Sequence, residues 1–230
     1  MNNKTIVALL FLLLFSLGAQ AQVSWSVSAG MTYSNIISKR DGNKASTESI
    51  PGISFGLDVD LPLSGAFSLQ PGIQYAKRGF KVPGEAHIGW GTNFIARASY
   101  LELPINAVYS PRVGPGKLHL AAGPYIGYGL GGKWESDGMV IVGDIAFEGS
   151  GDLFFKNDGF EGGKGTNSYS YAKPWDFGLN FKAGYTFMKH YGLNLVFQHG
   201  LANLKQKFGD YKPDGSLRNK SFGIELNYNF

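Results

Sequence analysis

Residues 51–80 read PGISFGLDVDLPLSGAFSLQPGIQYAKRGF and contain two segments of alternating polarity. In residues 53–61 every second side chain is apolar, with Ser, Gly or Asp between them, and residues 67–76 repeat the alternation with Ser, Gln, Gly or Ala between. Residues 62–66, PLSGA, carry turn-forming side chains. Because successive side chains of a strand point to opposite faces, each segment has one apolar and one polar face. The stretch therefore predicts a β-hairpin.

The same unit recurs to the end of the chain. Together with the two strands of the 51–80 hairpin, the alternating segments 24–34, 97–109, 117–130, 175–187, 192–202 and 218–230 make eight. Long polar connections (35–49, 81–96, 131–174 and 203–217) alternate with short ones (62–66, 110–116 and 188–191). Short turns at one end and long loops at the other are typical of outer-membrane barrels. The sequence predicts an all-β, eight-stranded antiparallel up-and-down transmembrane barrel, with both termini on the periplasmic side.

The direction in which each face points separates this barrel from a soluble one. A soluble up-and-down barrel would turn its polar face to water, and that face should be rich in charge. Here charged residues make up only 17% of the chain, and small polar side chains of this kind suit a filled eight-stranded interior. Aromatic side chains also gather at both ends of the apolar face, as in the girdles of membrane barrels. The expected girdle comprises Trp25, Phe67, Tyr109, Phe187 and Tyr228 near the turns, and Tyr33, Tyr75, Tyr128 and Trp175 near the loops.

The amino-terminal residues 1–21, MNNKTIVALLFLLLFSLGAQA, have the pattern of a secretory signal peptide. Lys4 gives the positive start, an apolar stretch follows, and Ala19-Gln20-Ala21 fits a cleavage site. The apolar stretch is short for a transmembrane helix, which needs about 20 residues. We expect a signal peptide over 1–21 and a single barrel domain over 22–230.

Three prolines oppose the strand assignment. Pro71, Pro104 and Pro124 lie within alternating segments, and proline cannot donate to a strand ladder. A closed barrel has no edge strand to hold them, so we expect β-bulges near these positions.

Several classes of function lack support in the sequence. The chain has no cysteine, and its net charge of +4 without a basic run gives nucleic-acid binding no basis. His87, His119, His190 and His199 do not have the spacing of metal ligands. Ser, His and Asp at the loop rim show no arrangement that would support catalysis. We therefore expect no enzymatic activity, no cofactor and no metal.

One charged set faces the expected barrel interior. Lys182 stands on the polar face, and so do the carboxylates Asp58, Asp60, Glu102 and Glu225. Charges in a narrow interior must be paired or hydrated. Two readings stay open: a structural ion-pair network that plugs the barrel, and a gated polar path for small ions or protons.

The longest connection, residues 131–174, is rich in Asp and Gly but lacks calcium-loop spacing. Its segments 139–147 and 152–156 are expected to form a hairpin above the membrane. Because loops on rigid scaffolds commonly carry binding sites, a protein or small-molecule ligand is expected on 131–174 or 35–49.

The order and spacing of several phrases resemble a known family. These are AGMTYSNI at 29–36, residues 51–79, YLELP at 100–104, AGPYIGY at 122–128, DFG at 176–178 and the terminal Phe230. Over residues 25–230 the chain resembles the outer-membrane β-barrel domain family of Bacteroidetes, the PorT-like small barrels. The resemblance implies the outer membrane of a Gram-negative cell and an OmpA/OmpX-like architecture. It implies no single activity.

The resemblance also bears on the last strand and on the role of the barrel. Phe230 resembles the carboxy-terminal signal that the barrel assembly machinery reads, although it would also serve as a last girdle residue. We expect a monomer in contact with outer-membrane lipids, which acts as a non-enzymatic scaffold or binding barrel through its extracellular loops. The alternative is a narrow porin-like channel for small solutes or ions.

Overall fold

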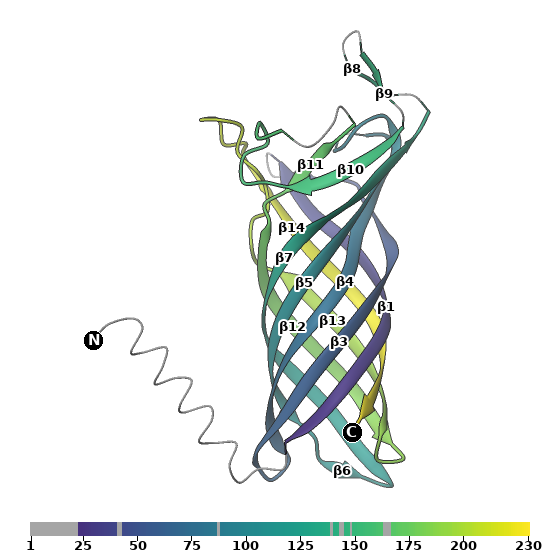
Figure 1. Ribbon diagram of the computed structural model, residues 1–230, viewed down its shortest axis with the longest axis vertical. Helices are drawn as coiled ribbons and strands as arrows, with labels where there is room; N and C mark the ends of the chain where they lie inside the picture. The colour runs from purple at the N-terminus through teal and green to yellow at the C-terminus, as the bar shows by residue number, and fades with distance from the viewer. Residues whose placement is uncertain are drawn as a thin grey trace, which may run out of the picture.

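The computed structural model describes residues 23–40, 43–86, 88–138, 140–142, 145–147, 149–162 and 167–230. Eight long strands form a closed antiparallel barrel, as predicted (Figure 1). They are β1 (Ser24–Arg40), β3 (Glu48–Ser64), β4 (Phe67–Glu85), β5 (Thr92–Tyr109), β7 (Gly116–Asp137), β12 (Trp175–Phe187), β13 (Tyr191–Gly200) and β14 (Ser216–Asn229). The last strand pairs back with the first, with Met31 opposite Ile224, so the ring of strands has no open edge.

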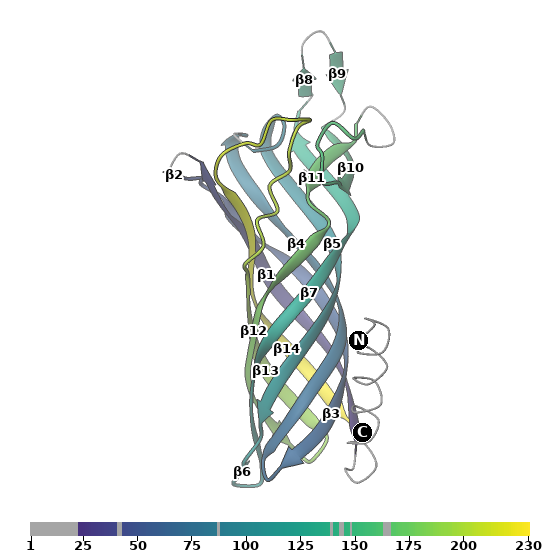
Figure 2. The same ribbon diagram turned by 90° about the vertical axis from the view of Figure 1, so that its left-hand side faces the viewer.

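Six short strands belong to the connections: β2 (Asn43–Lys44), β6 (Arg112–Val113), β8 (Val140–Val142), β9 (Ile145–Phe147), β10 (Ser150–Phe155) and β11 (Tyr169–Ala172). β8 pairs with β9, whereas β10 pairs with β7 and lies parallel to β11. The expected hairpin between 139–147 and 152–156 is therefore wrong. The second segment instead extends the barrel wall at the loop end, where β10 and β11 cross the upper rim (Figure 2). Among the described residues, no helix is long and apolar enough to cross a membrane.

The two faces of the barrel wall exchange their character along its height. In the lower part the outside is apolar and the inside polar: Phe55 and Leu57 are exposed, whereas Ser54 and Asp58 are buried. Toward the loop end the same alternation continues with the opposite chemistry. There Phe94 and Trp134 are buried, while the outward Arg97 is exposed and pairs with Glu135. The lower part is thus built for lipid outside, and the upper part for water outside.

This exchange explains why several strands extend further toward the loop end than predicted. β1 continues past position 34 to Arg40, β4 past 80 to Glu85, and β7 past 130 to Asp137, while β5 begins at Thr92 and not at 97. Above the lipid-facing belt the apolar side chains move to the inner face. The pattern that marked the strands below therefore ends, although the strands do not.

The prolines sit in the ladders without β-bulges beside them. Pro71 pairs with Ile105, Pro104 with Tyr125, and Pro124 with Leu179. The register is the same on both sides of each proline. The register shifts of these strands fall elsewhere, for example between Ser49 and Ser54. The expectation of bulges at the prolines is therefore wrong.

Candidate functional site

The lower half of the barrel interior holds a buried ion-pair cluster, here called the lower charged cluster (Asp58, Gln74, Lys182 and Glu225). The ammonium of Lys182 on β12 lies 3.0 Å from a carboxylate oxygen of Glu225 on β14 and 3.8 Å from one of Asp58 on β3. The amide of Gln74 on β4 donates to the other oxygen of Glu225 at 2.7 Å. The cluster joins four strands across the interior, as buried charges require partners.

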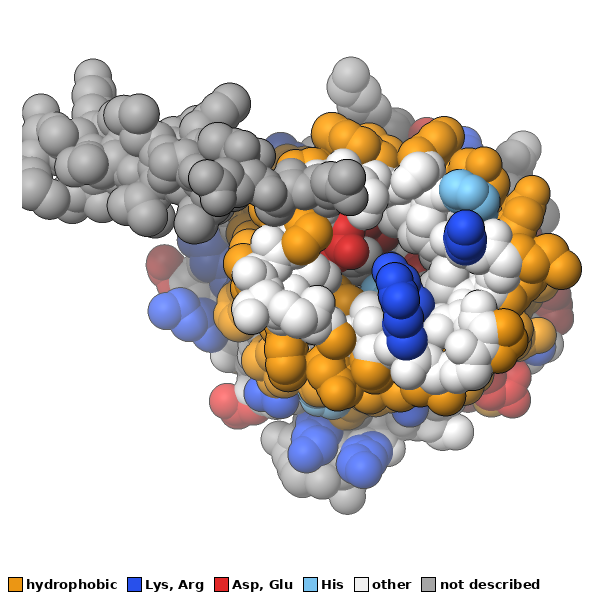
Figure 3. All heavy atoms as spheres, turned by 90° about the horizontal axis from the view of Figure 1, so that it is seen from below, with side chains coloured by type: hydrophobic (Ala, Val, Ile, Leu, Met, Phe, Trp, Pro, Cys, Tyr) orange, Lys and Arg blue, Asp and Glu red, His pale blue; other side chains and the backbone are white. Residues whose placement is uncertain are grey.

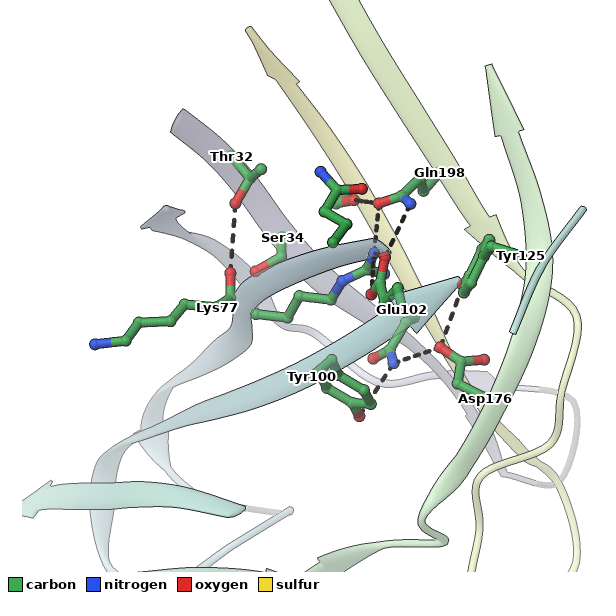
Figure 4. Close-up of polar contacts among 12 residues, drawn as sticks. Thr32, Ser34, Lys77, Tyr100, Glu102, Tyr125, Asp176 and Gln198 are labelled. Carbon is green, nitrogen blue, oxygen red and sulfur yellow. Dashed lines mark hydrogen bonds and ion pairs between the residues drawn. The ribbon is translucent and has the colours of Figure 1, made fainter. Parts of the chain in front are cut away.

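A second cluster of polar side chains, here called the upper polar cluster, lies toward the loop end (Figure 4). Its members are Arg78, Tyr100, Glu102, Tyr125, Asp176, Gln198 and Asn219. Its centre is Arg78 on β4, whose guanidinium lies 2.6 Å from Glu102 on β5 and also donates to Gln198 on β13. The Gln198 amide in turn donates to Glu102 at 3.1 Å. The Arg78 guanidinium also lies over the rings of Tyr100 and Tyr125, 5.8 and 5.5 Å from their centroids.

Asp176 on β12 completes the upper polar cluster without a direct cation partner. Its carboxylate accepts hydrogen bonds from the Tyr125 hydroxyl at 3.2 Å and the Asn219 amide at 2.9 Å. The Asn219 amide also donates a hydrogen bond to the Tyr100 hydroxyl at 3.2 Å. Neutral donors therefore hold this carboxylate in place.

The five interior residues predicted from sequence separate into three places. Asp58, Lys182 and Glu225 come together in the lower charged cluster, but Glu102 pairs with Arg78. Asp60 accepts a hydrogen bond from Ser68 at 2.6 Å and faces the turn end. The single network of Lys182 with four carboxylates is therefore wrong in two of its members.

Sequence reasoning missed Arg78 and left Asp176 out of the charged set. Arg78 continues the inward positions of β4, two residues beyond Ala76. Extending the alternation past the last apolar residue of the hairpin would have found it. Asp176 is an inward residue at the start of β12, between the outward Trp175 and Phe177, and its position alone gives no sign of its partners.

Above the upper polar cluster the interior is filled by an apolar plug (Phe80, Val82, Phe94, Trp134, Leu153, Tyr171 and Leu204). Inward side chains of β4, β5 and β7 meet side chains from the loops. The rings of Phe94 and Trp134 stack with centroids 5.9 Å apart, and Tyr171 stacks on Phe80 at 5.9 Å. The plug closes the polar interior from the loop side.

From the turn end the interior is open. A cavity of about 630 Å³, here called the vestibule, is lined by Asp60, Gln70, Lys117, His119 and Lys189 among others. Seen from below, acidic side chains lie inside the hollow and Lys and Arg side chains stand at its mouth (Figure 3). A narrower space of about 20 Å³, also lined by Gln70 and His119, continues up to Lys182. The vestibule ends at the lower charged cluster.

At the opposite end the four long connections enclose a cleft of about 1020 Å³, here called the loop cleft. Lys44 comes from the first connection, Ile88 from the second, Tyr169 from the third and Tyr211 from the fourth. Burial raises the pKa of Tyr169 to about 12, so its hydroxyl stays protonated at neutral pH. The cleft presents aromatic faces together with amide, hydroxyl and charged groups.

Two connections are fastened to each other beside the cleft by a loop clasp (Asp158, Phe160, Gln206, Phe208 and Gly209). The Gln206 amide donates to the Lys156 carbonyl and the Ser170 hydroxyl, both at 2.7 Å. The rings of Phe160 and Phe208 meet edge-on with centroids 5.5 Å apart. These contacts give the cleft a defined shape.

Asp158 is the titratable member of the loop clasp. Its carboxylate accepts hydrogen bonds from the backbone amides of Phe160 at 3.0 Å and Gly209 at 3.2 Å. These bonds, with Lys207 3.5 Å away, hold the pKa of Asp158 below its usual value. Asp158 is therefore ionised at neutral pH. Among the residues that the structure describes, no group of three or more acidic or histidine side chains is arranged to hold a metal ion.

The predicted girdle residues lie on the outer face, where seven of the nine side chains are exposed and Tyr75 and Tyr228 are half-buried. The tilted rings of Phe67 and Tyr109 have centroids 4.7 Å apart, and the edge-on rings of Tyr128 and Trp175 have centroids 4.8 Å apart. The exposed Phe230 lies at the turn end, where its backbone amide donates to the Trp25 carbonyl at 2.9 Å. Whether these rings meet lipid headgroups, and whether Phe230 is read during assembly, stay predictions.

Comparison with solved structures finds similar barrels at low sequence identity. Ail of Yersinia pestis is 15% identical, with 90% of this chain and 99% of that chain covered and a TM-score of 0.41. Neisserial surface protein A is 12% identical (90% and 99% covered, TM-score 0.44). OprG of Pseudomonas aeruginosa is 14% identical (91% and 97% covered, TM-score 0.46). Likeness at this level concerns the fold alone.

Comparison with curated proteins gives no match. The sequence model of the outer membrane protein beta-barrel domain, in contrast, matches residues 18–206, which is most of the chain. The lipid-facing lower belt of this barrel, its closed ring of strands and its polar interior agree with that match. The chain belongs to the outer membrane protein beta-barrel domain family.

Proposed function

We propose that this outer-membrane barrel is a non-enzymatic scaffold that binds a ligand or partner protein in the loop cleft. The observation that carries the proposal is that all four long connections contribute side chains to one cleft. Exposed aromatic rings at its rim, Phe208 and Tyr211, stand next to the charged groups of Lys205 and Asp214. Concave sites that combine aromatic faces with a few polar groups are typical of ligand binding.

The interior supports a closed barrel. A solute that moves through it would have to displace the apolar plug, the Arg78–Glu102 pair and the Lys182–Glu225 pair in turn. Each of these is buried and either packed or ion-paired inside the barrel. The barrel on this account is a rigid support for its loops.

The alternative is a narrow channel for small solutes or ions, and one observation favours it. The vestibule reaches from the turn end to Lys182, so the lower part of the interior is open and polar. For conduction the plug would have to move aside.

We also propose how the protein is exported and where it resides in the cell. We propose that residues 1–21, which lie outside the described residues, are a cleaved signal peptide, and that residues 22–230 form a monomer in a Gram-negative outer membrane. Both termini lie on the periplasmic side, and the barrel assembly machinery reads Phe230 during insertion. The aromatic girdle meets the lipid headgroups. The finer relationship is to the PorT-like small barrels of Bacteroidetes.

The binding proposal is tested by a thermal-unfolding screen of the refolded chain against a panel of oligosaccharides, peptides and lipopolysaccharide fragments. A compound that raises Tm should lose its effect in a Phe208→Ser/Tyr211→Ser variant, because both rings line the cleft. It should keep its effect in Pro83→Ser, an exposed change outside the residues that line the cleft. If no compound in the panel shifts Tm, or if the double variant responds like the parent, the loop cleft is not the binding site.

A further inference from the structure

The three short turns of the barrel carry large apolar side chains at their tips. Leu63 before the β3–β4 turn is 63% exposed, Val113 in the β5–β7 turn 51%, and Met188 in the β12–β13 turn 78%. These residues lie beyond the lower aromatic side chains Phe67, Tyr109 and Phe187. Single exposed apolar side chains are common on protein surfaces, but here every one of these turns presents one. An aqueous periplasm gives no reason for that pattern.

The β12–β13 turn has a backbone that its residues adopt only at a cost. Met188 and Lys189 have φ angles of 50° and 67°. Glycine or asparagine takes this left-handed conformation most readily, and other side chains destabilise it. The other two turns use glycines there, Gly65 and Gly114. The β12–β13 turn therefore carries Met188 and Lys189 at a conformational cost that glycine would avoid.

The same end gathers cations without acidic partners. Arg112 and Lys117 are directly opposite each other in the β6–β7 ladder, and both are exposed. Like charges in such a pair repel. Lys117 and Lys189 line the mouth of the same vestibule. Among the described residues, none of the three cations forms an ion pair. The Asp60 carboxylate at the same end accepts a hydrogen bond from Ser68.

The height of the β12–β13 turn places the tip of Met188 in one layer of the membrane. A strand advances about 3.3 Å per residue, which at a tilt of about 40° is roughly 2.5 Å along the membrane normal. Met188 follows the aromatic Phe187 by one residue, so its tip lies within the headgroup layer, which is about 5–7 Å thick on each side. That layer offers phosphate groups next to the upper ends of acyl chains.

We propose that the turn end of the barrel is a binding surface for anionic phospholipids of the inner leaflet. Leu63, Val113 and Met188 enter the apolar boundary of the lipid. Arg112, Lys117 and Lys189 bind its phosphate groups, which relieves the repulsion between Arg112 and Lys117. A phospholipid satisfies both sets at once, whereas a free anion would satisfy only the cations.

The test uses the refolded chain in nanodiscs with equal amounts of phosphatidylglycerol and phosphatidylcholine. Native mass spectrometry measures the ratio of the two lipids that stay bound. The parent should retain phosphatidylglycerol in excess. Each cation near an anionic surface is worth roughly a fivefold change in affinity, so Arg112→Gln/Lys117→Gln/Lys189→Gln should reduce the preference by up to about 100-fold. The matched variant Lys39→Gln/Lys133→Gln/Lys212→Gln changes three exposed cations at the loop end that do not line the loop cleft, and it should keep the preference.

A second variant separates the lipid from a free anion. Val113→Ser/Met188→Ser keeps all three cations and should weaken retention of phosphatidylglycerol while leaving binding of inorganic phosphate unchanged. If the parent shows no lipid preference, if the loop-end variant loses it equally, or if inorganic phosphate alone abolishes it and the serine variant behaves like the parent, the proposal is wrong. Folding of each variant is checked by the gel shift of the unheated barrel.

Discussion

Replacing Arg78 by Leu should destabilise the barrel far more than an equivalent change in an exposed pair. The side chains of Arg78 and Glu102 are 2% and 1% exposed, and the guanidinium is the nearest cation to that carboxylate. Removing one partner of a buried pair leaves an uncompensated charge, which costs about 3–5 kcal/mol. Arg78→Leu should therefore lower the free energy of unfolding by about that amount.

The control has the same chemistry on the outside. Arg97 pairs with Glu135 at the loop end, and those side chains are 48% and 50% exposed. Exposed pairs contribute about 1 kcal/mol or less because water screens them. Arg97→Leu should therefore have a small effect.

The assay is equilibrium unfolding in urea from phosphatidylcholine vesicles, followed by tryptophan fluorescence. The double variant Arg78→Leu/Glu102→Leu should recover most of the lost stability, since replacing both partners of a buried pair by apolar groups is often close to neutral. If Arg78→Leu costs no more than Arg97→Leu, or the double variant is no more stable than the single one, the upper polar cluster is not organised around this pair.

The lower charged cluster, the apolar plug and the loop clasp can each be tested by one substitution. Lys182→Met should lower the free energy of unfolding by about 3 kcal/mol, measured in the same way, because it leaves the carboxylates of Asp58 and Glu225 without their cation. An unchanged free energy would mean that water from the vestibule already compensates these carboxylates. Trp134→Ala should cost roughly 3–5 kcal/mol, since the indole is 1% exposed within the apolar plug; a loss below 1 kcal/mol would show a loosely packed plug. The hydrogen bonds to Asp158 depress its pKa below the unfolded value of about 3.9, so the loop clasp should be intact at neutral pH and open as the pH falls below about 4. Distances between spin labels at Gly162→Cys and Lys212→Cys should lengthen in that range, and in an Asp158→Asn background they should be independent of pH.

The lower barrel could be read from the sequence because one rule governs it. Lipid outside and a narrow polar interior require apolar and polar side chains to alternate strictly. The positions of Phe55 and Asp58 in the sequence therefore show that Phe55 faces outward and Asp58 inward. The upper barrel follows the opposite rule. Phe94 and Trp134 turn inward there, and Arg97 faces water, so a search for apolar outward positions stops too early.

The contacts inside the barrel depend on quantities that alternation does not contain. Lys182 and Asp58 meet across the interior from strands that are not neighbours. Arg78 pairs with Glu102 because the tilt of the strands brings the two side chains to one height. Strand tilt and shear fix which inward residues share a layer. The loop clasp has no sequence signal at all, since Gln206 and Asp158 are tied by backbone groups of distant segments.

Single-channel recording of the refolded 22–230 chain in planar bilayers shows whether the barrel interior is closed. Because the apolar plug and the two charged clusters fill the interior, protein shown to be folded should give no discrete openings at moderate voltage. Reproducible openings from the parent chain would contradict a closed interior, because they would require a continuous polar path through both charged clusters and the apolar plug.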